Sequence, residues 1–247
     1  MKKITWICTL LIMVMCLAGC DTDKSTAKQL LEGTINNTIK GKVSKTYMDI
    51  NGGVASFDPA NERNELQYEM VKYLQAAYAY EKPDDLDRGT TSSFGEVYEE
   101  ILKNFEYEMS DLEKIGKGRY KATITYKPFA LGDVLDPVAM EFYEEADKEL
   151  EEEAKNPPLV KIDTGFSYID RRLFQLLLEK TNEFAKDIKY SEEISTDVVI
   201  TVTDSFWTLS DSYYYDFITS IIDLNLDEIE ALEEELEESQ EVEQEVE

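Results

Sequence analysis

The chain has 247 residues, 53 of them acidic and 25 basic, and its formal net charge at pH 7 is -28. Such a surface repels nucleic acid, because nucleic-acid binding depends on neutralising phosphates with lysine and arginine. The chain also contains no histidine, which removes the commonest general base, the commonest transition-metal ligand and every histidine-activated nucleophile. We therefore expect no nucleic-acid partner and no cofactor.

The first twenty residues have the layout of an export signal. Two lysines precede an apolar run over residues 4–17, which is shorter than the ~20 residues that a membrane-spanning helix needs. The run ends in Leu17-Ala18-Gly19-Cys20, and this tetrapeptide resembles the lipobox of bacterial lipoproteins. The resemblance implies that residues 1–19 are removed as a signal peptide. It also implies that Cys20 carries a diacylglyceryl thioether, usually with an acyl chain such as palmitate on its amino group.

A lipidated Cys20 would hold the chain on a membrane from outside the cytoplasm, because two or more acyl chains give stable anchoring. Cys8 and Cys16 lie in the removed peptide, so no other cysteine remains for a disulfide or a nucleophile. The mature charge becomes -30 when Lys2 and Lys3 are lost, and this charge repels anionic headgroups. We expect the acyl chains to contact the membrane, and a cationic ligand or an envelope protein to be the further partner.

The first half of the body is predicted to begin with a polar tether over residues 20–27 and a helix over residues 28–40. Asp58-Pro59 predicts a second helix, with aspartate as the N-cap and proline in the first turn. Ser93, with a glutamate three residues later, fits a capping box at the start of a third helix. Residues 41–57 give no firm assignment.

Two strands follow the third predicted helix. Residues 105–109 alternate apolar and polar side chains, and a turn at Gly116-Lys117-Gly118 leads into a longer alternating run over residues 120–126. Pro128 ends this run, because proline cannot donate to a strand ladder. The pattern is typical of a β-hairpin with one buried face.

In the second half, Asp136-Pro137 predicts a helix whose glutamates between Glu141 and Glu153 form its solvated face. Ser167 is expected to cap the next helix, which extends to Phe184. Further strands are expected at residues 188–190 and 198–202, with a short one at Trp207. A last helix is expected from Asp211 to Ile221.

These elements predict an α+β fold, with antiparallel strand pairs packed with amphipathic helices in one domain over residues 28–226. The order of helix, strand pair and helix occurs at 94–154 and again at 168–224, which is compatible with an internal duplication. Residues 227–247 contain twelve acidic residues and no basic one. This composition predicts a flexible acidic tail.

Two acidic segments are weak candidates for metal binding. Asp84, Asp85 and Asp87 follow a proline in a predicted loop, and hard cations favour carboxylate oxygens. Asp223 and Asp227, together with Asn225 and Glu234, match positions of a calcium loop of the EF-hand kind. The sixth position of that loop is Glu228 where glycine is needed. The alternatives are a solvated loop for the first segment and a continuing helix for the second.

Two further motifs have simple structural alternatives. Asp163-Thr164-Gly165 resembles the signature triplet of aspartic proteases, but those enzymes need two such aspartates and the chain has one. A turn ahead of a helix is the alternative. Trp207 and the run Tyr213–Tyr215 contain enough aromatic surface for a cage around a cation, and ordinary core packing is the alternative.

The expected function is that of a membrane-anchored extracytoplasmic lipoprotein, a non-enzymatic module that binds a ligand or partner at the cell envelope. The hairpin Tyr120–Pro128 ahead of a helix gives the body a loose resemblance to uncharacterised surface lipoproteins of Gram-positive bacteria. The alternative is a carboxylate-dependent hydrolase of wall or peptide substrates, which needs two acids converging in a cleft. A solute-binding component of a transporter is a third hypothesis, although the mature chain is small for two hinged lobes.

Overall fold

The computed structural model of the chain describes residues 24–51, 58–79, 88–155, 168–202, 207–209 and 216–225. Over these residues the fold is α+β, as predicted. The chain divides into two compact units made of interleaved segments, and the single domain expected over residues 28–226 stays a prediction. Unit 1 contains Met1–Leu66, Leu102–Lys127 and Glu193–Ile218, and unit 2 contains Gln67–Ile101, Pro128–Glu192 and Thr219–Glu247.

Unit 1 begins with a helix over residues 24–38, followed by α2 (Lys45–Ile50). The first helix starts four residues earlier than expected, because Ala27 is fully buried and extends the apolar face by one turn. Residues 24–27 therefore belong to the folded unit and not to the predicted tether. α2 occupies a segment where the sequence pattern predicted no element, and Ser44 caps it by accepting the N–H of Tyr47 at 3.1 Å.

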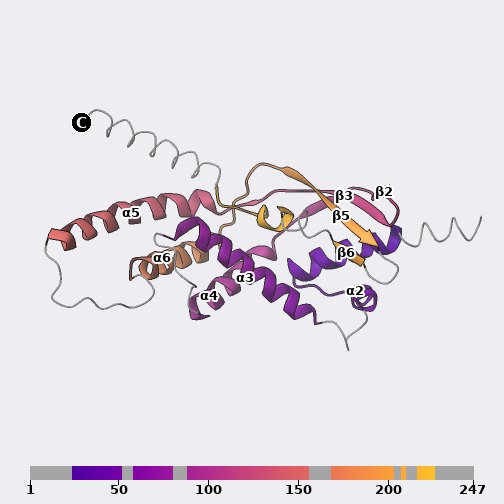
Figure 1. Cartoon of the computed structure of the whole chain (residues 1–247), viewed down its shortest axis with the longest axis horizontal. Coiled ribbons are helices and arrows are strands. Elements are labelled where there is room, and N and C mark those ends of the chain that lie inside the picture. The colour runs from indigo at the N-terminus through magenta and orange to yellow at the C-terminus, as the bar shows by residue number, and fades with distance from the viewer. Residues whose placement is uncertain are drawn as a thin grey trace, which may run out of the picture. The chain divides into compact units, whose positions relative to one another are not determined.

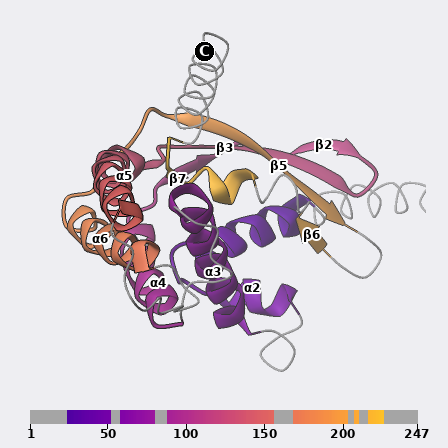
Figure 2. The same ribbon diagram turned by 60° about the vertical axis from the view of Figure 1, so that its left-hand side comes forward.

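The sheet of unit 1 is antiparallel and has five strands, with β3 near its centre. The strands are β1 (Tyr107–Met109), β2 (Glu113–Gly116), β3 (Arg119–Tyr126), β5 (Ile194–Val202) and β6 (Trp207–Leu209). β1 and β2 pair with one edge of β3, and β5 pairs with the other edge. In both Figure 1 and Figure 2 the helix over residues 24–38 and α2 lie on the same side of this sheet.

The hairpin predicted around Gly116–Gly118 is confirmed as β2 and β3. Burial alternates strictly along β3, which places Tyr120, Ala122, Ile124 and Tyr126 on the inner face of the sheet. The predicted alternation at residues 105–109 also forms a strand, and this strand pairs with the far half of β3. The short strand expected at Trp207 is confirmed as well.

The second predicted strand pair is partly wrong. β5 pairs with β3 and β6, whereas residues 188–190 contribute only an isolated bridge between Tyr190 and Phe129. The helix expected over residues 211–221 is limited, within the described residues, to 216–219. It ends there because Ile222 and Asp223 gain a parallel strand partner in β4. The pairing of β3 with β5 joins the β2–β3 hairpin and the β5–β6 pair in one sheet, and the internal duplication stays a prediction.

Unit 2 is mainly helical. It contains most of α3 (Pro59–Tyr78) and α4 (Arg88–Leu102), together with α5 (Gly132–Lys155) and α6 (Tyr168–Phe184). β4 (Phe129–Ala130) pairs in parallel with β7 (Ile222–Asp223). Its buried side chains include Leu74, Phe94, Leu135, Phe174 and Ile221. No helix in the described part of the chain is both long enough and apolar enough to cross a membrane.

The helix starts show where local signals succeed and where they fail. Asp58 caps α3 as predicted, since its carboxylate accepts the N–H of Ala60 at 3.0 Å. α4 begins at Arg88, so Ser93 is not its N-cap; the Ser93 hydroxyl donates to the carbonyl of Gly89 at 3.0 Å instead. α5 begins at Gly132, one turn before the predicted start, and Pro137 near its N-terminus costs a single backbone hydrogen bond.

Candidate functional site

The outer face of β3 and β5 carries a row of hydrogen-bonding side chains. The strand register places Thr123 opposite Asp197 and Thr125 opposite Ser195. The Thr123 hydroxyl donates to Asp197 Oδ1 at 2.7 Å, and the Lys121 ammonium donates to Asp197 Oδ2 at 3.0 Å. One row further along, the hydroxyl oxygens of Thr125 and Ser195 lie 2.8 Å apart. We call Lys121, Thr123, Thr125, Ser195 and Asp197 the outer polar row.

The electrostatics of this row suit binding better than proton transfer. The hydroxyl of Thr123, and after it the ammonium of Lys121, hold the pKa of Asp197 below its usual value. A carboxylate with a lowered pKa is a weak general base, because its affinity for a proton is low. The side chain of Asp197 is 42% exposed, so an ionised oxygen acceptor remains within reach of a partner.

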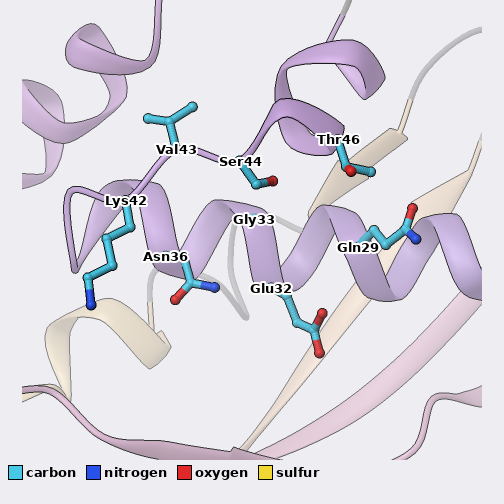
Figure 3. Close-up of a pocket in the computed structure, with 8 residues that line it drawn as sticks. All are labelled: Gln29, Glu32, Gly33, Asn36, Lys42, Val43, Ser44 and Thr46. Atoms are coloured by element: carbon cyan, nitrogen blue, oxygen red, sulfur yellow. The ribbon is translucent and has the colours of Figure 1, made fainter.

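Unit 1 also has an open groove of about 410 Å³ between the helix over residues 24–38 and the segment before α2. It is lined by Gln29, Glu32, Gly33, Asn36, Lys42, Val43, Ser44 and Thr46. Small-molecule sites of this volume are mostly apolar and have polar groups that converge on the ligand. Figure 3 shows the side chains of Glu32 and Lys42 pointing away from Ser44 and Thr46. The groove therefore lacks the convergence expected of a ligand site.

A buried cluster begins at Gly33, which also lines this groove. A Cβ at Gly33 would overlap a ring carbon of Tyr47, so the bare glycine is what lets the tyrosine pack against the helix. The Tyr47 hydroxyl donates to Glu62 Oε2 at 2.8 Å, and Asn37 Nδ2 donates to the same oxygen at 2.8 Å. Asn37 is fully buried, and its Oδ1 has no partner among the described residues. This Tyr47–Glu62–Asn37 cluster ties α2 and the start of α3 to the first helix.

Unit 2 contains a similar cluster at the N-terminus of α5. The buried Tyr78 hydroxyl donates to Asp136 Oδ1, and Asn225 Nδ2 donates to Asp136 Oδ2 at 3.0 Å and to Asp133 Oδ1 at 3.1 Å. Burial, and after it the hydrogen bond to Asp136, raises the pKa of Tyr78. Gly132 lies against this cluster, since a Cβ there would be 2.7 Å from the carbonyl carbon of Leu224.

Asp133 and Asp136 are an acid pair of the general kind that the hydrolase hypothesis requires. Both oxygens of Asp136 accept hydrogen bonds from protein side chains, and Asp133 shares the amide of Asn225. These bonds hold the first turn of α5 against the segment 223–225. The arrangement is that of a structural clamp, since both oxygens of Asp136 and Oδ1 of Asp133 accept hydrogen bonds that join segments of the protein.

Most predicted site residues lie outside the described part of the chain: Cys20, Asp84, Asp85, Asp87, Asp227, the triplet 163–165 and the tyrosines 213–215. Asp223 is described. Its Oδ2 accepts the Ser191 hydroxyl at 2.6 Å and its Oδ1 accepts the backbone N–H of Asn225 at 3.1 Å. Among the described residues no three acidic, histidine or cysteine side chains gather in a way that could hold a metal ion. The calcium-loop interpretation of residues 223–234 stays a prediction.

The glutamate-rich face of α5 is solvated over its described side chains. Glu141, Glu144 and Glu145 are exposed, whereas Phe142 and Ala146 are buried. Further along, Glu149 accepts a hydrogen bond from Arg172 of α6 at 2.9 Å. This face is the one that the sequence pattern assigned to solvent.

The two buried clusters escape sequence analysis because their members are far apart in the chain. Asn37 and Glu62 are 25 residues apart, and Asn225 and Asp136 are 89 apart. One local signal was available: Asn37 lies seven residues after Leu30, on the apolar stripe of the first helix. A polar residue on such a stripe indicates a buried hydrogen-bond partner.

The chain matches no protein family, and no curated protein is significantly similar to it in sequence. Its fold is similar to the crystal structure of ycdA from Bacillus subtilis, a protein described there as a candidate lipoprotein, with a TM-score of 0.53 at 19% identity. The match covers 84% of this chain and 59% of ycdA, so the chain spans less than two thirds of that protein's length. At this identity the likeness shows a shared fold.

Proposed function

We propose that the chain is a lipoprotein anchored through Cys20, whose α+β body lies outside the cytoplasm and binds a ligand or partner at the cell envelope without catalysing a reaction. The anchoring rests on the lipobox resemblance of residues 17–20. The shared fold with a candidate lipoprotein supports it. The binding role rests on one observation, the outer polar row of unit 1.

The outer polar row has the features of a recognition surface. Its side chains project from two adjacent strands, whose spacing of about 4.8 Å fixes the hydrogen-bonding groups in place. Asp197 contributes an ionised and accessible acceptor. These features favour a partner that presents a hydroxyl or amide together with a cationic group, such as a lysine or arginine side chain.

A crosslinking experiment in cells tests this proposal. A photo-crosslinking residue in place of Thr125 should capture a discrete partner, and Asp197→Asn in the same chain should abolish the capture. The matched control places the crosslinker at Tyr68, which is exposed on α3. Capture from both positions, or capture that survives Asp197→Asn, would show that the row is not the binding surface.

The hydrolase alternative is separated from binding by a different readout. If Asp133 and Asp136 form a catalytic pair, Asp133→Asn should abolish turnover of a wall or peptide substrate while the unfolding midpoint stays within a few degrees of wild type. The binding proposal predicts no such turnover in the wild-type chain. Envelope-substrate turnover that depends on Asp133 would replace the binding proposal.

A further inference from the structure

The β2–β3 hairpin is locally basic, although the chain as a whole is acidic. Residues 113–121 hold three lysines and one arginine but a single acidic residue, in a chain with 53 acidic and 25 basic residues. Lys114, Lys117 and Arg119 are exposed around the turn. The turn depends on Gly118, whose φ of +66° lies in the left-handed region. A fixed basic tip thus projects from an acidic body.

An apolar side chain accompanies these charges. The register shifts between Lys114 and Gly116, so Ile115 has no partner on β3. Bulges of this kind re-aim side chains, and Ile115 is 41% exposed. Exposed apolar and basic side chains together favour the interfacial region of an anionic bilayer, because buried apolar area and attraction to anionic lipids both strengthen binding.

The hairpin lies at the end of unit 1 that the proposed anchor would hold near the membrane. In both Figure 1 and Figure 2 the turn between β2 and β3 and the beginning of the indigo helix over residues 24–38 lie toward the same end of this unit. Cys20 precedes Lys24 by four residues, which span at most about 14 Å. Acyl chains on Cys20 therefore keep this end close to the headgroups.

Only charges close to the bilayer contribute to the electrostatic interaction between this end of unit 1 and the headgroups. Screening at physiological ionic strength limits charge interactions to about 8 Å, so most of the acidic body contributes little at the bilayer surface. Each lysine or arginine near an anionic surface strengthens binding about fivefold. Lys24 and Lys28 add to the positive charge at this end, and Asp21 and Asp23 of the tether oppose it. Together with Lys114, Lys117 and Arg119 of the hairpin, the basic residues named at this end outnumber Asp21, Asp23 and Glu113 by five to three.

We propose that the β2–β3 hairpin is a membrane-contact site for anionic lipid headgroups. Lys114, Lys117 and Arg119 bind the headgroup phosphates and Ile115 enters the interface, which holds unit 1 in one orientation on the bilayer. This inference rests on the proposed lipidation of Cys20. It replaces the expectation that the acyl chains alone contact the membrane.

Quenching by headgroup-labelled lipid tests the contact on the lipidated mature chain in vesicles. A fluorophore is attached to Ile115→Cys, which is selective because Cys20 is a thioether in the lipidated chain. The matched control is Ile194→Cys, since Ile194 is 37% exposed. It pairs with Tyr126 at the other end of β3, about 23 Å along the strand from Arg119.

We expect strong quenching at position 115 and weak quenching at position 194 in vesicles of phosphatidylcholine with phosphatidylglycerol. Phosphatidylcholine alone, or the triple variant Lys114→Gln, Lys117→Gln, Arg119→Gln, should reduce the quenching at 115 to the control level. The circular dichroism spectrum checks that the triple variant is folded.

Equal quenching at the two positions would overturn the membrane-contact site, as would quenching at 115 that is insensitive to lipid charge and to the triple variant. In either case, a chain that still floats with the vesicles would leave the proposed anchoring through Cys20 standing. A chain that does not float and whose N-terminal peptide carries no acyl mass overturns the anchoring proposal instead.

Discussion

The two units use the same set of side chains over very different sequence separations. In unit 1 a buried tyrosine donates to Glu62, and the amide of Asn37 donates to the same carboxylate. In unit 2 a buried tyrosine donates to Asp136, and the amide of Asn225 donates to that carboxylate too. Each cluster lies against a glycine whose Cβ would collide with a neighbour.

The difference lies in which parts of the chain each cluster joins. The hydrogen bonds to Glu62 join residues 15 and 25 apart, whereas those to Asp136 join residues 58 and 89 apart. Closing a longer loop costs more conformational entropy. The cluster of unit 1 thus joins elements that follow one another in the chain. The cluster of unit 2 forms only when the segment 223–225 packs against the start of α5.

The largest effect is expected from Gly33→Ala in unit 1. The new Cβ would overlap the ring of Tyr47, which is itself buried, and overpacking of this kind costs about 3 kcal/mol. Gly95→Ala is the matched control, because its Cβ meets nothing nearer than 3.4 Å and alanine favours a helix by about 1 kcal/mol. Urea unfolding measures both. A Gly33→Ala chain as stable as Gly95→Ala would contradict the close packing of Tyr47 against Gly33.

The next effect is expected at Asn225 in unit 2. Asn225→Gly removes two hydrogen bonds to carboxylates and should destabilise unit 2 by about 2 kcal/mol. Asn225→Ala should cost more than Asn225→Gly, because its φ of 51° is strained for alanine. Hydrogen exchange resolved by residue should place the loss in unit 2. An equal loss of protection from hydrogen exchange in the helix over residues 24–38 would contradict the claim that the two clusters stabilise separate units.

Alkaline pH should weaken unit 2 through its buried tyrosines. Burial raises the pKa of both Tyr98 and Tyr78, so the folded chain keeps them neutral while the unfolded chain ionises them above pH 10. Stability is therefore full below pH 10 and falls above it by about 1.4 kcal/mol per pH unit for each tyrosine. Tyr98→Phe should remove one such contribution from the slope, and Tyr68→Phe on the exposed face of α3 should not. An unchanged slope in Tyr98→Phe would refute this assignment.

The smallest effect is expected in the outer polar row of unit 1. Thr123→Val removes the main cause of the lowered pKa of Asp197, which should rise toward its usual value in an NMR titration. Because Asp197 is partly exposed, the loss of stability should stay below about 1 kcal/mol. It should be present at neutral pH and vanish as Asp197 is protonated in acid. Thr201→Val, on the same face of the sheet, should leave the Asp197 titration in place.

The sequence predicted those features whose causes are local. The alternation along β3 identified its inner and outer faces, and Asp58-Pro59 marked the start of α3. The predicted starts of α4 and α5 were wrong, and a distant contact decides that of α5. The first turn of α5 closes against the backbone of Leu224, which no pattern near Gly132 reveals.

The candidate site divides in the same way. The alternation of apolar and polar residues is enough to place Lys121, Thr123 and Thr125 on the solvent face of the hairpin. Their partner Asp197 depends on the register between β3 and β5, which brings Asp197 to Thr123 across 74 residues of sequence. The bulge that exposes Ile115 also depends on strand pairing, so the sequence pattern predicts only a turn at the hairpin tip.

The central claim is that this body is anchored through Cys20, and the mass of the N-terminal peptide tests it most directly. The chain is expressed from its first methionine in a bacterial host, and the membrane fraction is digested and analysed by mass spectrometry. The account predicts a peptide that begins at Cys20 and carries a diacylglyceryl group, and a Cys20→Ala chain that yields no such peptide. An unmodified peptide that still contains residues 1–19, or a free thiol on Cys20, would contradict it.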